Sequence, residues 1–257
     1  MSLHLDRRED GIAIVTMDRP GKRNAFTLEM YRALGEIFAV LDAEEAVRCI
    51  ILTGAAGHFC AGSDIGDFDT TRDDVAQARD YADFTLSMTD RVKFCRHPTI
   101  AAIEGVCVGG GLEMASLCDI RLGAAGSRYG IPINRIAMTV DHRELVDLIE
   151  VIGHRAVLEI LIEGRIFGVE EAMAKGLLTR VVPEGEALPA ALDAAAAIAR
   201  TAPLSNRLHK KFIRRLRDPA PLTEAEKAEA YACFSTEDYR IGRAAFLRKE
   251  RPAFVGR

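Results

Sequence analysis

Short apolar runs rich in β-branched residues alternate with helical patterns through the first half of the chain, and this alternation most constrains the fold. The runs that predict strands cover residues 11–18, 49–54, 99–105 and 119–125. Between the first two runs, residues 27–41 place apolar side chains at helical spacing behind Thr27, whose hydroxyl can cap a helix. Strands that alternate with helices in this way predict an α/β fold.

From Asp141 onward the strand pattern fades and helices dominate. Glycine or proline separates helical segments at residues 141–152, 154–163, 169–175, 187–201, 203–217 and 222–234. One extended segment, residues 177–183, is predicted to return to the core. Because no repeat or low-complexity linker interrupts the chain, we predict one domain, with a core over residues 1–200 and a helical extension over residues 201–257.

Charge and hydropathy exclude several classes of partner. The 257 residues are 49% hydrophobic and 28% charged, as in a folded globular protein, and carry a net charge of −4. The one basic run, Lys210–Arg217, alternates with apolar residues and predicts a solvated helix face, so we expect no nucleic-acid partner. No apolar stretch reaches the roughly 20 residues that a membrane helix needs, so we expect no membrane partner.

Cysteine and histidine spacing predicts a reducing compartment and no metal site. The six cysteines include no C-x-x-C pair, and most lie in or beside apolar runs, which fits the cytoplasm. The six histidines show no ligand spacing, and neither His58 nor His142 is predicted to be catalytic.

Three consecutive glycines, Gly109–Gly111, stand between a predicted strand and a helix-forming run. The first N–H groups of such a helix have no intrahelical acceptor and can hold an oxyanion. Glu113 lies roughly one turn past Gly110, where a carboxylate can reach the same helix end. Alternatively, the glycines only allow close packing and Glu113 only complements the helix dipole.

A second small-residue bend favours the functional interpretation. Ala61-Gly62-Ser63, within the stretch "HFCAGSDI", follows the predicted strand at residues 49–54. Its N–H could enter the same crevice at the carboxyl ends of the strands. Two such donors would form an oxyanion hole.

Five motifs together resemble the crotonase superfamily, specifically the enoyl-CoA hydratase/isomerase family, over nearly the whole chain. They are "RPGKRNAFT", "HFCAGSDI", "AIEGVCVGGGLEMASLCDIRLGA", "GRIFGVEEAMAKGLLTRVVP" and "STEDYRIGRAAFLRKERPAFVGR". The resemblance implies a spiral of β-β-α units with a C-terminal helical trimerisation layer, in a homotrimer or homohexamer. It also implies that the backbone N–H groups of Ser63 and Gly110 form the oxyanion hole and that Glu113 is the first catalytic glutamate.

The same resemblance implies a coenzyme A thioester as substrate and no permanently bound cofactor. Relatives hold the coenzyme A portion at the positions of Lys22, Arg23, Ala25, Ala61, Asp64 and Ile65. Phe246 and Lys249 align with residues that help to cover coenzyme A, often across a subunit boundary.

The chain departs from the hydratases at the second catalytic glutamate. The segment Tyr129-Gly130-Ile131-Pro132 is followed by Ile133 where those enzymes carry glutamate. Asp141 falls where several isomerases of the family place a catalytic acid, so it is a candidate second carboxylate. Asp141 and Glu144 also have the spacing of a helix capping box, and both interpretations stay open.

The sequence therefore predicts an enzyme that stabilises a thioester enolate and transfers protons with Glu113. Hydration of a 2-enoyl-CoA and isomerisation of the double bond both fit. The alternatives are an acyl-CoA-binding pseudoenzyme, or a decarboxylase or thioesterase of the same superfamily. Phe84 and Met88, in a predicted helix, are expected in the core by default.

Overall fold

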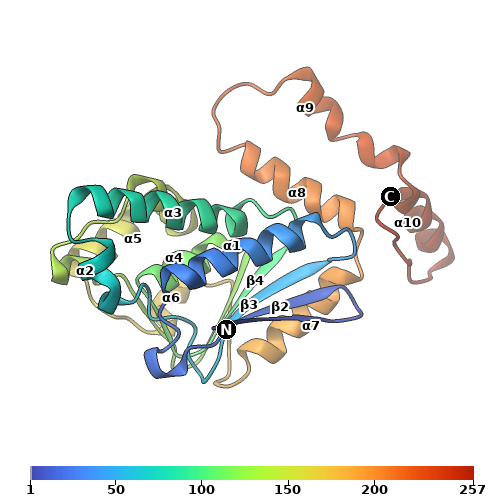
Figure 1. The fold of residues 1–257 in the computed structure, drawn as a ribbon. Helices are drawn as coiled ribbons and strands as arrows, with labels where there is room; N and C mark the ends of the chain where they lie inside the picture. The colour runs from blue at the N-terminus through green and yellow to red at the C-terminus, as the bar shows by residue number, and fades with distance from the viewer. Residues whose placement is uncertain (1) are drawn as a thin grey trace.

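Six strands form the central sheet of the computed structural model, which describes residues 2–257 (Figure 1). In sheet order they are β1 (Leu3–Arg7), β2 (Ile12–Met17), β3 (Cys49–Gly54), β4 (Thr99–Ile103), β6 (Ile120–Ala124) and β8 (Arg180–Val182). β1 is antiparallel to β2, and every other neighbouring pair is parallel. All the predicted strands are confirmed, and the sequence analysis missed the edge strand β1.

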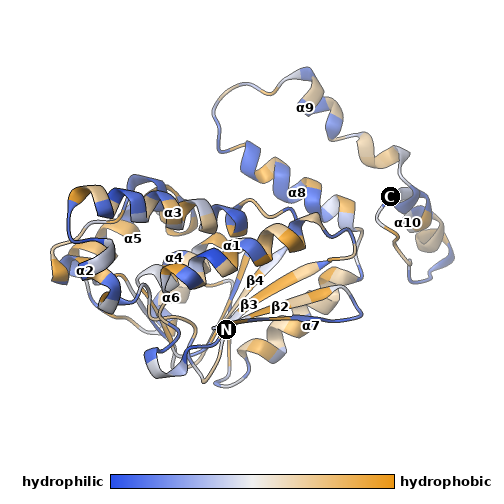
Figure 2. Ribbon diagram, in the orientation of Figure 1, coloured by the Kyte–Doolittle hydropathy of each residue, from blue (hydrophilic) through white to orange (hydrophobic). Residues whose placement is uncertain are grey.

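Alternation along the inner strands divides the core between the two faces of the sheet, since successive side chains point to opposite faces. Ile50 and Leu52 of β3 pack toward α1 (Leu28–Ala43), whereas Ile51 packs toward α7 (Ala187–Ala199). Figure 2 shows apolar residues along the strands and α7. α7 carries small alanines such as Ala191 and Ala195, which let it approach the sheet closely.

The predicted helices of the core are present with local capping that explains their starts. Thr27 accepts a hydrogen bond from the Met30 N–H at 3.3 Å and begins α1. The other core helices are α2 (Phe68–Thr71), α3 (Val75–Lys93), α4 (Gly110–Leu117), α5 (His142–Glu163) and α6 (Val169–Ala174). Gly153 breaks α5 with a φ of 75°, at the boundary that the sequence predicted. Phe84 and Met88 of α3 pack against the core, as expected.

A small second sheet continues the core toward the crevice. β5 (Val106–Val108) pairs in parallel with β7 (Arg128–Gly130). Isolated bridges join Cys60 to Cys107 and Phe26 to Ser63. These short pairings, which the sequence analysis did not predict, bring the loop after β3 beside the entry to α4.

The C-terminal helices leave the sheet and extend from the body as an arm (Figure 1). The arm consists of α8 (Pro203–Arg215), α9 (Glu224–Glu229) and α10 (Glu237–Arg248). The predicted helix over residues 222–234 is shorter than expected, and α10 was missed. The basic run is only partly a solvated face, because Lys210 is buried whereas the apolar Ile213 is 71% exposed. Within residues 2–257, no helix is both long and apolar enough to cross a bilayer.

Candidate active site

Two backbone segments meet at the carboxyl ends of the parallel strands. The bend Ala61-Gly62-Ser63 follows β3, and Gly109 joins β5 to α4 with a φ of 56°, a conformation that favours glycine. A Cβ added at Gly62 would approach the Gly110 nitrogen to 3.2 Å, so only glycine fits there without displacement. The backbones of the two loops are therefore in close contact.

The N–H groups of Ser63 and Gly110 are neighbours with no internal acceptor. A Cβ on Gly110 would lie 3.7 Å from the Ser63 nitrogen. Throughout residues 2–257, neither N–H donates a hydrogen bond to the protein. Both residues line the same cavity. The pair therefore has the composition and placement of an oxyanion hole.

Two tyrosines fix the Ser63 side chain beside this pair of amides. The Tyr31 hydroxyl lies 3.2 Å and the Tyr81 hydroxyl 3.0 Å from the Ser63 Oγ. Burial raises the pKa of both phenols, so they stay protonated and can donate. Because α1 carries Tyr31 and α3 carries Tyr81, two helices determine the position of one loop residue.

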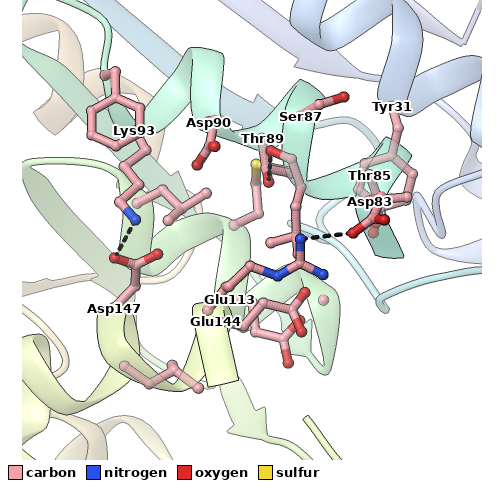
Figure 3. Close-up of a pocket in the computed structure, with 17 residues that line it drawn as sticks. Tyr31, Asp83, Thr85, Ser87, Thr89, Asp90, Lys93, Glu113, Glu144 and Asp147 are labelled. Atoms are coloured by element: carbon pink, nitrogen blue, oxygen red, sulfur yellow. Dashed lines mark hydrogen bonds and ion pairs between the residues drawn. The ribbon is translucent and has the colours of Figure 1, made fainter. Parts of the chain in front are cut away.

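Glu113, in the first turn of α4, faces Glu144 in the first turn of α5 (Figure 3). Burial is the main cause that raises the pKa of each carboxyl above its ordinary value. The charge of Glu144 raises the pKa of Glu113 further, while the Arg72 guanidinium opposes the shift. Two adjacent carboxyl groups in a buried site resist simultaneous ionisation, so the protonated form of the pair persists to higher pH than in an exposed glutamate.

Asp141 caps α5 and has its oxygens occupied. Its carboxylate accepts hydrogen bonds from the Arg143 N–H at 2.9 Å and from the Arg143 Nε at 3.0 Å. Glu144 completes the capping box by accepting the Asp141 N–H at 3.3 Å. The Arg143 guanidinium lowers the pKa of Asp141 to about 2. Of the two interpretations of Asp141, this geometry favours the cap, although Asp141 also lines the cavity.

Two cavities meet at the carboxylate pair. The larger, about 740 Å³, contains the Ser63 and Gly110 amides and extends beneath α2 and the start of α3. The smaller, about 320 Å³, lies between α3 and α5 and is lined by Asp90 and Lys93. Glu113 and Glu144 line both. The two carboxyl groups therefore lie where the cavities meet, with space on both sides that can hold a ligand.

The residues that the resemblance assigns to coenzyme A gather at one side of the larger cavity. Ala61 and Ile65 line it. Ala61 donates its N–H to the Arg23 carbonyl at 3.0 Å, and the Lys22 Nζ lies 3.7 Å from the Asp64 carboxylate. Ala25 is buried behind these residues. Asp64 is held by an ion pair with Arg19 at 2.7 Å, which makes it a support for the loop.

Phe246 and Lys249 lie elsewhere in this chain. Both belong to the end of α10, on the arm, and neither lines the two cavities. Phe246 is 83% exposed. Within one chain, these residues are thus separated from the other predicted site residues (Figure 1).

Sequence reasoning missed four residues of the site. Tyr31 matched the apolar spacing of a core helix, and Glu144 was assigned only to a capping box. Tyr81 and Arg72 lie in a segment without a recognisable motif. The available signal for Glu144 was its first-turn position, which places a side chain over the N-terminal end of α5. No residue pattern indicated that this end would face α4.

Comparisons with known proteins agree with this geometry. The profile of the family described as Enoyl-CoA hydratase/isomerase matches residues 7–257. Enoyl-CoA hydratase EchA19 of Mycobacterium tuberculosis is 32% identical, over 98% of this chain and 96% of the relative. Enoyl-CoA hydratase ACTT3 of Alternaria alternata is also 32% identical, over 95% of this chain and 83% of the relative.

Solved structures of the family have the same fold as this chain. A structure described as an enoyl-CoA hydratase/carnithine racemase from Magnetospirillum magneticum has a TM-score of 0.98 and 44% identity. The match covers 100% of this chain and 96% of that one. An enoyl-CoA hydratase from Bacillus anthracis has a TM-score of 0.93 and 27% identity, with 100% of both chains covered.

Proposed function

The chain is an enzyme of the enoyl-CoA hydratase/isomerase family, with the crotonase fold, and from this premise we propose its reaction. It adds water across the double bond of a 2-enoyl-CoA thioester. The amides of Ser63 and Gly110 stabilise the thioester oxygen as it gains negative charge. Fixed amides do this without reorganising, and each contributes about 3 kcal/mol in comparable sites.

One observation carries this proposal. Two backbone N–H groups that donate to no acceptor among residues 2–257 line the same cavity as a pair of adjacent carboxyl groups. In the hydration, one ionised carboxylate of the Glu113–Glu144 pair accepts a proton from water as the C3–O bond forms. The double-bond electrons move toward the thioester and form the enolate. The protonated partner then delivers its proton to C2, and the pair again holds one proton, as at the start.

Glu144 supports hydration because it supplies the second carboxyl group that Ile133 does not. In the hydratases that the chain resembles, this group falls at the position of Ile133, which lines the larger cavity. Isomerisation is the second candidate, favoured by this same apolar residue, because one carboxylate can move a proton between two carbons without a second group. Each reaction passes through the same enolate.

The proposal also covers the binding of coenzyme A and the assembly of subunits. The segment from Lys22 to Ala25 and the loop from Ala61 to Ile65 hold the coenzyme A portion, chiefly through main-chain groups. Phe246 and Lys249 cover it from a neighbouring subunit of a homotrimer or homohexamer. Their exposure on an arm that extends from the body supports contact with another chain.

The decisive experiment follows exchange of the C2 proton of a saturated acyl-CoA with solvent deuterium, together with turnover of crotonyl-CoA and of a 3-enoyl-CoA. We expect exchange and crotonyl-CoA hydration in the native protein. Glu113→Gln and Glu144→Gln should each reduce hydration by roughly 10² to 10⁴. Glu36→Gln, an exposed glutamate of α1, is the matched control.

The other outcomes separate the alternatives. Tight binding without exchange or turnover would identify a pseudoenzyme. Release of free coenzyme A or of carbon dioxide would identify a thioesterase or a decarboxylase. Rapid crotonyl-CoA hydration by both glutamine variants would exclude the proposed roles of Glu113 and Glu144.

A further inference from the structure

The larger cavity is lined by arginines that form no ion pair within residues 2–257. Of its four lining arginines, Arg143 is paired with Asp83 at 2.8 Å and with Asp141 at 2.9 Å. Arg72, Arg79 and Arg135 form no ion pair with any of residues 2–257. Arg79 and Arg135 are exposed, whereas Arg72 is partly buried.

Arg72 is held rigidly by stacking. Its guanidinium carbon lies 3.7 Å from the centre of the Phe68 ring and 3.9 Å from the centre of the Tyr81 ring. A guanidinium between two aromatic faces keeps its N–H groups at its edges, in the plane of the group. The two rings thus fix the direction in which Arg72 can donate hydrogen bonds.

The donors of Arg72 are not used within the described chain. Its Nε is buried and has no hydrogen-bond partner among residues 2–257. Its side chain makes no other hydrogen bond to the protein there. The two terminal nitrogens of Arg72 also lack partners there but, unlike Nε, are not buried. A charged donor without a partner is costly, so a ligand in the cavity is the natural acceptor for these terminal N–H groups.

The position of Arg72 relative to the amides identifies the part of the ligand that reaches it. Tyr81, which stacks on Arg72, also donates from its hydroxyl to the Ser63 Oγ at 3.0 Å. One aromatic ring therefore separates the guanidinium from the oxyanion hole. The residues assigned to coenzyme A gather around Ala61 and Ile65, at one side of the larger cavity. Arg72 lies instead on the wall formed by α2 and α3.

We propose that Arg72 binds a carboxylate on the acyl group, so that the substrate is the coenzyme A monothioester of a dicarboxylic acid. Arginine pairs with carboxylate through parallel hydrogen bonds, and the stacked guanidinium is preorganised for that geometry. Arg79 and Arg135 add positive charge at the rim. The inference rests on the proposed function for the position of the thioester.

The test measures binding by calorimetry, since saturated acyl-CoA thioesters have no double bond to hydrate. Succinyl-, glutaryl- and adipyl-CoA are compared with butyryl-, valeryl- and hexanoyl-CoA of equal chain length. We expect at least one dicarboxylic thioester to bind about tenfold more tightly than its neutral counterpart. Arg72→Met should bring that ratio close to one, and Arg72→Lys should retain part of it.

Arg180→Met is the matched control, because Arg180 is an exposed arginine of β8 outside both cavities, and it should leave the ratio unchanged. Equal binding of both members of all three pairs by the native protein would overturn the proposal, and so would a preference that survives Arg72→Met. Because binding needs no turnover, failure of the proposed reaction would be seen separately, as absent hydration of crotonyl-CoA.

Discussion

Glu113 and Glu144 come from separate helices, yet their carboxyl groups face one another in one site. Each is at the first turn of its helix, where the dipole favours negative charge. Burial acts in the opposite direction and raises the pKa of both. The charge of Glu144 adds to the shift of Glu113, and the charge of Asp141 adds to the shift of Glu144. Carboxyl groups with raised pKa values suit general acid/base chemistry better than ordinary glutamates do, because their protonated form persists to higher pH.

This pair should lower stability at high pH. A pKa raised in the folded chain means that folding binds a proton, so stability falls as the pH rises above the ordinary glutamate value of 4.5. Glu113→Gln removes the titrating carboxyl group and with it this loss of stability at high pH. We expect its thermal midpoint at pH 8 to exceed that of the native protein by at least about 2 °C, with little difference near pH 4.

Differential scanning calorimetry across this pH range would measure the effect. Glu36→Gln, with an exposed side chain, should show the native pH dependence. A Glu113→Gln variant that is less stable than the native protein at pH 8 would contradict the paired arrangement.

At the scale of secondary structure, α4 depends on how closely its first turn approaches the loop after β3. A Cβ at Gly111 would overlap the carbonyl oxygen of Cys60. Gly111→Ala must therefore push α4 and this loop apart, and overpacking of this kind costs about 1–3 kcal/mol. Because Cys60 leads directly to Ser63, activity should fall more than stability.

Chemical denaturation and crotonyl-CoA turnover would test this prediction. Gly21→Ala is the matched control, because an added Cβ there meets nothing within 4 Å. Native stability and activity in Gly111→Ala would show that the contact is not required.

The start of α5 gives a second test at this scale. If Asp141 acts as a cap, Asp141→Ala should cost about 1 kcal/mol, whereas Asp141→Ser should keep most of the stability and the activity. If Asp141 instead donates a proton to substrate, both variants should lose activity equally. Denaturation and crotonyl-CoA turnover, measured on both variants, separate the two roles.

The Asp141 cap also has a predicted pH dependence. Hydrogen bonding and the charge of Arg143 lower the pKa of Asp141 to about 2. The ionised cap therefore stabilises the folded protein fully at pH values above the ordinary carboxyl pKa. The contribution is lost as the pH falls toward 2. The stability difference between native protein and Asp141→Ala should therefore shrink in acid.

For the whole molecule, a buried lysine attaches the arm to the sheet. The Lys210 Nζ lies 2.6 Å from the Asp119 Oδ2 and donates to the His97 carbonyl at 2.7 Å. Asp119 in turn accepts the Thr99 N–H at 2.8 Å. α8 is thus linked by charge to β4 and to the residue that precedes β6.

Lys210→Met should loosen the arm without unfolding the sheet. Its loss leaves the Asp119 carboxylate without its nearest cation, at a cost of about 2 kcal/mol. Hydrogen exchange should become faster in residues 203–257, and β3 should stay protected. Lys211→Met removes an exposed lysine next to it and should change little. Equal exchange in both variants would exclude the proposed attachment.

Much of the element order could be predicted because apolar spacing reports burial directly. The parallel strands of the core and helices such as α1 and α7 follow from this pattern. β5 and β7 were missed because three residues are too few for a period to emerge, and β1 because polar residues interrupt its two leucines. The division near residue 200 and the assembly into a trimer or hexamer stay predictions, the latter to be checked by light scattering.

The sequence by itself determined the family resemblance, the glycine turn before Glu113 and the loop at Ser63. Local conformational requirements fix these features, and they are written in consecutive residues. Only the tertiary structure decided which side chains share the cavity. Glu144 and Arg72 are far apart in sequence, and each has an ordinary local interpretation as a cap or a surface charge. Packing of α3 and α5 against α4 brings Glu144 to Glu113, and packing of α2 against α3 brings Arg72 to the wall of the same cavity.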